Sequence, residues 1–235
     1  MAELKFEDGL LTGQFAGHPE LAKSFLAERN KQSKTVRFYK RGLDLSLTLV
    51  FMPLWLSIIA ILGLLARFDG GPGFFAHERI GRNGRRFKCW KIRTMVPDAA
   101  DRLARHLNAN PTARLEWQEN HKLNDDPRIT CLGRFLRRTS LDEIPQLLNV
   151  LRGDMSLVGP RPVVQDELEK YGVYRSGYLA MTPGITGLWQ ISGRNDVSYA
   201  ARVMMDLEYL AKSSLLLDLK ILIKTLHAVL ARTGK

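Results

Sequence analysis

The pattern of hydrophobic positions in this 235-residue chain is dominated by one uncharged apolar run. Residues 45–66 read LSLTLVFMPLWLSIIAILGLLA. At about 1.5 Å per helical residue the run would reach roughly 33 Å, close to the thickness of a bilayer's hydrocarbon core. The pattern therefore predicts a membrane-embedded helix, and a helix buried in the protein's own core is the alternative.

Basic side chains flank both ends of the run, and such residues favour the cytoplasmic side of a membrane. The upstream group is Arg29, Lys31, Lys34, Arg37, Lys40 and Arg41, and the downstream group is Arg67, Arg79, Arg82, Arg85, Arg86, Lys88, Lys91 and Arg93. Pro53 lies inside the run, where it removes a backbone hydrogen bond and bends a helix. We therefore expect a re-entrant helix that bends at Pro53 and returns to the same face. A mildly kinked spanning helix is the alternative.

A second membrane-facing candidate covers residues 214–232, SLLLDLKILIKTLHAVLAR. Its apolar positions at helical spacing are Leu215, Leu219, Leu222, Leu226 and Val229, and Lys220 and Lys224 lie on another face. This is the pattern of a basic amphipathic helix in the lipid headgroup layer. Packing against the protein's own core is an equally good interpretation.

The middle of the chain predicts a hairpin followed by short helices. The strands FFAHERI and RFKCWKI flank Asn83-Gly84, a turn in which both residues tolerate positive φ. Residues 97–108 and 111–123 predict two helices, with Pro97 in the first turn of the earlier one. Asp126-Pro127 predicts a turn before a short strand or helix.

The stretch TSLDEIPQLLNVLRGDMSLVGPRP, residues 139–162, predicts another short helix. Its apolar face would consist of Ile144, Leu147, Leu148 and Leu151, with Gly153 at its end.

Asp142 and Glu143 precede this helix, and Ser140 with Glu143 fits a capping box. The helix dipole would stabilise both charges, so we expect Asp142 to have a low pKa and to be ionised at pH 7. Two ordinary first-turn acids are the plain alternative.

Charge and composition narrow the class of partner. The formal net charge is +11, which indicates an anionic partner. The basic residues bracket an apolar segment and are not interleaved with stacking aromatics, which argues against a nucleic-acid binder. Cys89 and Cys131 form no CxxC and predict reduced thiols, and the five histidines show no zinc-binding spacing.

Eight motifs taken in order resemble those of the bacterial sugar transferases, which are monotopic phosphoglycosyl transferases. They are KRGLDL, GGPGFF, RIGRNG, KIRTM, DPRIT, TSLDEIPQLLNVLRGDMSLVGPRP, TPGITGLWQISGRN and DLKIL, spread over residues 36–232. The resemblance is to the minimal form of the family, without extra transmembrane helices or another domain. One departure is Met52-Pro53, where many members have Ser-Pro; without the serine hydroxyl, the carbonyl freed by Pro53 has one fewer hydrogen-bond partner.

The resemblance implies an α+β fold with three parts. These are a polar extension (1–35), a re-entrant membrane helix (36–68), and a cytoplasmic catalytic domain with a small hairpin or sheet and interfacial helices (69–235).

The implied reaction moves a hexose 1-phosphate from a UDP-hexose to undecaprenyl phosphate, releases UMP and passes through an aspartyl phosphosugar. The resemblance makes Asp142 the nucleophile, and Glu143 either a Mg²⁺ ligand or a group that orients the nucleophile. Asp142 is a second candidate ligand of Mg²⁺. The predicted phosphate-binding residues are Lys91, Arg93, Arg137, Arg138 and Arg161, and the predicted nucleotide-binding residues are Gln190, Gly193 and Arg194. Lys91 and Arg93 could equally be solvated strand residues, and residues 190–195 a plain turn.

The implied location is the cytoplasmic face of the inner membrane, as the first membrane step of exopolysaccharide synthesis. The expected partners are UDP-galactose or UDP-glucose, undecaprenyl phosphate and membrane lipids, without nucleic acid; a homodimer stays open. A membrane-bound glycosyltransferase that releases UDP, and a non-catalytic scaffold for polysaccharide assembly, are the alternative functions.

Overall fold

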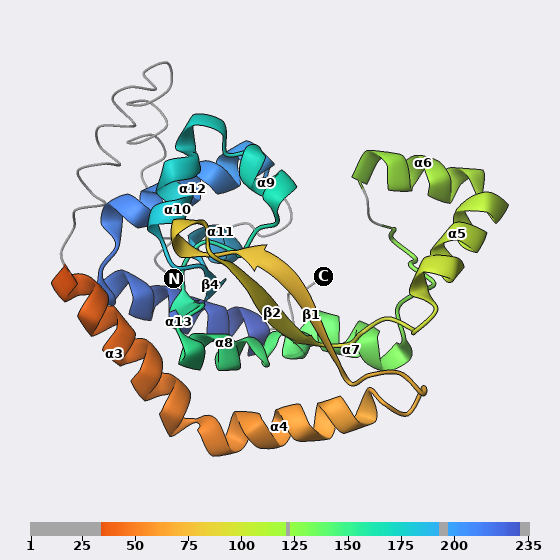
Figure 1. The fold of residues 1–235 in the computed structure, drawn as a ribbon, viewed down its shortest axis with the longest axis horizontal. Coiled ribbons are helices and arrows are strands. Elements are labelled where there is room, and N and C mark those ends of the chain that lie inside the picture. Colours follow the sequence, from red (N-terminus) through yellow and green to blue (C-terminus); the bar gives the residue numbers. More distant parts are fainter. Residues whose placement is uncertain (1–33, 121–122, 193–196, 231–235) are drawn as a thin grey trace. The chain divides into compact units, whose positions relative to one another are not determined.

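A computed structural model describes residues 34–120, 123–192 and 197–230, and its elements are mixed α and β (Figure 1). The chain divides into two compact units. In the described residues the larger unit contains 34–51, 77–89, 146–192 and 197–230, and the smaller unit contains 52–76, 90–120 and 123–145. The predicted α+β class is confirmed, while the predicted division into three parts stays a prediction.

The predicted hairpin is present, and its two strands contribute residues to both units. It consists of β1 (Phe74–Ile80) and β2 (Arg86–Ile92), drawn in yellow in Figure 1. A 3-10 turn at Arg82–Gly84 joins the strands, with φ of 56° at Asn83 and 77° at Gly84. Both residues of the Asn-Gly pair therefore adopt the left-handed conformation that the sequence predicted.

Helices make up most of the larger unit. They are α3 (Lys34–Val50), α8 (Gln146–Arg152), α9 (Gln165–Glu169), α10 (Arg175–Ala180), α11 (Leu188–Ser192), α12 (Tyr199–Lys212) and α13 (Leu215–Leu230). Its main core includes Leu168, Tyr178, Leu207 and Ile221. The Tyr178 hydroxyl lies at the centre: it donates to Ile80 O at 2.7 Å and accepts from Val163 N at 3.2 Å.

A second small sheet was not predicted. Strands β3 (Ser156–Val158) and β4 (Gly184–Thr186) pair in parallel, with Ser156 opposite Gly184 and Val158 opposite Thr186. Glycines allow this close approach, since a Cβ on Gly184 would lie 2.1 Å from Gly159 N. The close backbone packing between the two strands therefore explains why the LVGPRP and TPGITG motifs contain glycine.

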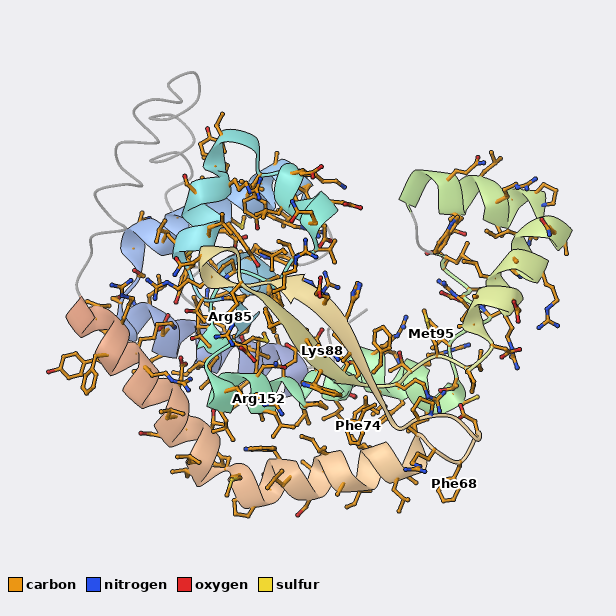
Figure 2. The ribbon with its side chains drawn as sticks, in the orientation of Figure 1. Phe68, Phe74, Arg85, Lys88, Met95 and Arg152 are labelled. Atoms are coloured by element: carbon orange, nitrogen blue, oxygen red, sulfur yellow. The ribbon has the colours of Figure 1, made fainter. Side chains whose placement is uncertain are left out.

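The smaller unit combines α4 (Met52–Leu65), α5 (Ala99–Ala109), α6 (Pro111–Asn120) and α7 (Cys131–Thr139). Its core consists of Leu62, Ala66, Ile92 and Leu136, with Leu141 packed beside them. Phe74 lies beside α4 in Figure 2. Its ring packs against Gly63, and a Cβ added to Gly63 would lie only 2.6 Å from Phe74 Cζ. The two predicted short helices correspond to α5 and α6, but Pro97 lies before α5 and not in its first turn.

The long apolar run forms two helices with a break at Phe51. In the described part of the chain no single helix has the length and apolarity to cross a membrane, but Val36–Val50 and Met52–Leu65 meet that test as a pair bent by 63°. Pro53 lies in the first turn of α4, and Ser57 Oγ donates to Pro53 O at 2.8 Å. The predicted break near Pro53 is therefore present.

Helix α4 is packed on one face only. It buries Trp55, Ile59 and Leu62, and leaves Leu54 and Leu64 more than 60% exposed. The alternative of a helix wholly buried in the protein's own core therefore does not describe α4.

The C-terminal helix α13 combines both interpretations of its sequence. Ile221 is fully buried in the main core, whereas Leu216, Leu219, Ile223 and Leu226 are exposed. Of the predicted apolar row, Leu222 packs against this core, and Ile221 beside it was not part of the prediction.

Candidate functional site

The segment that carries Asp142 is shaped by a left-handed residue. Ser140 ends α7 with φ of 57°, an uncommon conformation for a residue other than glycine. Its N–H group bonds to Arg137 O and Leu136 O. The chain then forms a 3-10 turn at Leu141–Glu143 that packs back against α7. This reversal places Asp142 in the same unit as Arg137 and turns it away from solvent.

The predicted capping box is wrong. The Ser140 side chain makes no capping hydrogen bond, because its backbone serves as the C-cap of α7. Asp142 and Glu143 lie in the 3-10 turn, and α8 begins only at Gln146, after Pro145. The two acids are therefore not in the first turn of α8.

The buried face of α8 also differs from the predicted one. Gln146, Asn149 and Val150 are buried in place of the four predicted apolar residues, which are half-buried. Asn149 Nδ2 donates to Lys88 O at 2.8 Å and to Asp154 Oδ2 at 3.4 Å. These hydrogen bonds explain why a polar side chain occupies the core position.

Lys91 brings a cation to both acids. Its Nζ lies 2.6 Å from Glu143 Oε1 and 4.0 Å from Asp142 Oδ2. Lys91 precedes Ile92, which anchors the end of β2 in the core of the smaller unit. The hydrogen-bonded partner of Lys91 is Glu143, and Asp142 receives a longer-range charge interaction.

Arg137 is fixed by Thr94, which belongs to the KIRTM motif but was not among the predicted site residues. Arg137 Nε donates to Thr94 Oγ1 at 2.9 Å. Helix α7 approaches the backbone of Thr94 closely because Gly133 has no side chain. A Cβ added to Gly133 would lie only 2.1 Å from Thr94 O. Thr130 N also donates to Thr94 O at 3.1 Å, so the segment after β2 and the start of α7 are joined at Thr94.

The environment of Asp142 contradicts the expected low pKa. Burial raises the pKa of Asp142 to about 6; Lys91 and Arg137 oppose this shift, and the neighbouring Glu143 charge adds to it. Desolvation exceeds the effect of the two cations because the residue is only 8% exposed. A carboxyl group whose pKa is raised toward neutral pH in this way is typical of a functional site.

Arg93 has a structural role in the observed geometry. Its guanidinium donates to Ala66 O, Pro72 O and Met95 O, each at 2.5 Å, and also pairs with Asp69. These contacts hold the segment between α4 and β1. They occupy the donors that a phosphate would need, so phosphate binding by Arg93 stays an untested prediction.

The remaining predicted residues lie on other parts of the chain. Arg138 is exposed on α7 in the smaller unit. Arg161 and Gln190 belong to the larger unit, where Gln190 Nε2 donates to Ile185 O at 3.3 Å. Gly193 and Arg194 lie outside the described residues.

Within residues 34–120, 123–192 and 197–230, no group of three His, Cys, Asp or Glu side chains could hold a metal ion. Asp142 and Glu143 still fit Mg²⁺, since this ion commonly uses one or two carboxylates together with water and substrate phosphates. Cys89 and Cys131 are free thiols, as predicted.

The carboxylate pair beside Lys91 and Arg137 combines a nucleophile with fixed positive charge, two features that phosphoryl transfer can use. A sequence model of the bacterial sugar transferase family matches residues 35–232. The chain therefore belongs to the bacterial sugar transferase family.

Curated relatives agree with this assignment. The chain is 50% identical over 205 residues to the UDP-galactose-lipid carrier transferase of Erwinia amylovora, which covers 87% of this chain and 43% of that protein. It is 47% identical over 207 residues to the undecaprenyl-phosphate galactose phosphotransferase of Salmonella typhimurium, covering 88% and 44%. It is 50% identical over 196 residues to the exopolysaccharide production protein ExoY of Sinorhizobium fredii, covering 83% and 87%. The chain thus spans less than half the length of the first two relatives.

Proposed function

We propose that the chain transfers a hexose 1-phosphate from a UDP-hexose to undecaprenyl phosphate and releases UMP. The observation that carries the proposal is the buried Asp142 carboxylate, held beside Lys91, Glu143 and Arg137. The choice of substrates is supported by two relatives, a UDP-galactose-lipid carrier transferase and an undecaprenyl-phosphate galactose phosphotransferase.

In the first step, an Asp142 carboxylate oxygen attacks the phosphorus that carries the sugar. An acyl phosphate bond forms, and the bond from this phosphorus to the bridging oxygen of the diphosphate breaks. The bridging oxygen keeps the electron pair and leaves as part of UMP. No proton needs to move, because both the nucleophile and the leaving group are anions.

In the second step, a phosphate oxygen of undecaprenyl phosphate attacks the same phosphorus. The bond to Asp142 breaks and restores the carboxylate, and the product is undecaprenyl diphosphate hexose. Two successive displacements at one phosphorus avoid bringing both anionic substrates to the site at the same moment.

The neighbours of Asp142 would stabilise the charge that these steps concentrate. Lys91 and Arg137 supply fixed positive charge near the attacking carboxylate, where low solvent exposure strengthens the interaction. Glu143 positions Lys91 through their 2.6 Å hydrogen bond. Arg138, Arg161, Gln190, Gly193 and Arg194 remain predicted ligands of phosphate or nucleotide.

Asp142 and Glu143 would hold Mg²⁺ when it is bound. The ion would offset the charge of the donor diphosphate. Lys91 then keeps its contact with the carboxylate pair and limits the negative charge left in the site.

We also propose that the protein is monotopic, at the cytoplasmic face of the inner membrane. The bent helix pair supports a re-entrant insertion, and the exposed apolar residues of α4 and α13 support contact with lipid. The basic residues at both ends of the apolar run favour one shared side.

The test is to incubate purified enzyme with each of a panel of UDP-sugars and undecaprenyl phosphate, and to identify the nucleotide released. UMP is expected for UDP-galactose or UDP-glucose, and UDP would favour a glycosyltransferase that moves only the sugar.

Asp142→Asn is expected to abolish UMP release, and Glu143→Gln to lower it. Without lipid acceptor, mass spectrometry should find a hexose phosphate adduct on Asp142 in the native enzyme. Full turnover by Asp142→Asn would instead support another nucleophile or a scaffold role.

A further inference from the structure

The larger unit contains a cavity of about 100 Å³ that no step of the proposed reaction uses. Three elements contribute most of its wall: the start of α3, the end of α12 and the start of α13. Arg82, from the turn of the hairpin, also lines it, as do Ala180, Met181 and Thr182 at and after the end of α10. All of these residues belong to one unit, so the cavity is a property of that unit alone.

Two arginines, Arg37 and Arg82, contribute to the wall. The guanidinium groups of Arg37 and Arg82 have no ion pair or hydrogen-bond acceptor among residues 34–120, 123–192 and 197–230. Arg82 Nε is buried without any partner. A buried donor left unpaired in this way costs stability, and a bound acceptor would remove that cost.

The two arginines also repel each other. Burial first, and then the Arg37 charge, lower the pKa of Arg82, which shows that the two guanidinium groups are close enough to interact. An anion placed between them would reverse this repulsion. Arginine pairs bind phosphate well because each planar group offers parallel donors.

The third cation of the cavity is already used. Lys40 Nζ pairs with Asp218 Oδ2 at 2.7 Å, and Tyr209 donates to Asp218 Oδ1 at 2.6 Å. Asp218, the carboxylate among the described wall residues, is therefore neutralised, and it does not exclude an anion from the two arginines.

The rest of the wall is largely apolar and partly open to solvent. Val36 and Leu215 line the cavity and are each 38% exposed, and the exposed Leu216 follows on α13. A soluble phosphate would make no use of these side chains, whereas the glycerol and acyl carbons of a lipid would cover them.

We propose that this cavity binds the phosphate headgroup of an anionic glycerophospholipid between Arg37 and Arg82. The bound lipid would join α3 to the start of α13 and so help to hold the two membrane-facing helices together. The site is separate from Asp142, and it takes a bulk membrane lipid that is not a substrate of the proposed reaction.

The test is to titrate phosphatidylglycerol into detergent-purified full-length enzyme and to count bound lipids by native mass spectrometry. The native enzyme is expected to keep one phosphatidylglycerol at a concentration at which phosphatidylcholine, diacylglycerol and glycerol 3-phosphate do not bind. The variant Arg37→Gln/Arg82→Gln is expected to bind phosphatidylglycerol at least roughly tenfold more weakly, because it loses charge-assisted hydrogen bonds.

The matched control is Arg85→Gln/Arg86→Gln, which removes the same number of positive charges, both from the hairpin that carries Arg82. Both residues are exposed, Arg86 pairs with Glu78, and Figure 2 labels Arg85. This control is expected to keep native lipid affinity. Ala180→Phe is a second test variant: it fills the cavity without changing either arginine and is also expected to lose the lipid.

Three results would overturn the proposal. The first is equal binding of phosphatidylglycerol by the native enzyme and by Arg37→Gln/Arg82→Gln. The second is binding of phosphatidylcholine or glycerol 3-phosphate as tight as that of phosphatidylglycerol, which would assign the site to a zwitterionic lipid or a soluble phosphate. The third is the absence of any phosphatidylglycerol adduct on the native enzyme. UMP release measured in parallel separates these outcomes from a failure of the proposed reaction.

Discussion

Lys91 and Glu143 are joined by a hydrogen bond of 2.6 Å between Nζ and Oε1, although they are 52 positions apart in the chain. This contact ties the end of β2 to the 3-10 turn that carries Asp142. It also places the Lys91 charge 4.0 Å from Asp142 Oδ2. The pair therefore fixes both the position and the electrostatic environment of the proposed nucleophile.

Lys91→Met should lower UMP release about 10- to 100-fold, the range for loss of a charge-assisted hydrogen bond. The variant leaves Glu143 without its Lys91 partner. It also removes the positive charge that lies near Asp142. Lys88→Met is the matched control, since Lys88 is exposed on the same strand (Figure 2), and it should stay near native activity. Equal losses in the two variants would show that only the net charge of the hairpin matters.

Asp142→Asn should increase stability at neutral pH while it removes activity. Because the folded-state pKa of Asp142 is raised to about 6, folding favours its protonated form. Ionisation therefore costs the native protein stability as pH rises from about 4 through about 6. Above that window the asparagine variant should be more stable by about 2 to 3 kcal/mol, and below it the difference should vanish.

Thermal unfolding of both proteins in EDTA, across this pH range, measures the effect. A stability difference that is already constant from pH 4 upward would mean that the pKa of Asp142 is not raised. Mg²⁺ added at neutral pH should reduce the difference if Asp142 is one of its ligands.

Arg93→Gln should reduce the free energy of unfolding by about 2 to 3 kcal/mol, because several charge-assisted hydrogen bonds are lost together. The KM for the UDP-sugar should change little in the protein that remains folded. Asp69→Asn removes one partner and keeps the three carbonyl contacts, so it should be less damaging. A large rise in KM with unchanged thermal stability would instead favour the phosphate-binding role predicted from sequence.

Thr94→Val should lower kcat/KM about tenfold, since it removes the oxygen that accepts from Arg137. Thr94→Ser keeps that oxygen and should restore most of the activity. Steady-state kinetics of the two variants separate orientation of Arg137 from packing of the Thr94 methyl group. Equal impairment of both would indicate that the methyl group is what matters.

Ile223→Glu should release part of the enzyme from the membrane fraction without unfolding it. Ile223 is 68% exposed on the apolar row of α13, so a charge there opposes lipid contact more than it disturbs the core. Asn108→Glu adds the same charge to an exposed polar position of α5 and should leave membrane retention unchanged. Native retention of Ile223→Glu would argue against an interfacial role for α13.

The sequence by itself determined the features that depend on local rules. Asn83-Gly84 specified the hairpin turn because both residues accept positive φ, and Pro53 marked the break near Phe51 because it lacks an N–H group. The ordered motifs also identified the family and selected Asp142 before any contact was known.

The tertiary structure decided what depends on neighbours distant in the chain. Ser140 takes up a left-handed conformation at the end of α7, which no capping pattern indicates, and the polar Asn149 is buried because Lys88 O accepts its hydrogen bond. The pKa of Asp142 is raised because desolvation is a sum over all surrounding atoms, and that sum is fixed only after the chain folds. The buried Arg82 Nε without a partner in the described part of the chain became visible for the same reason: a missing partner can be recognised only when the packing around the guanidinium is known.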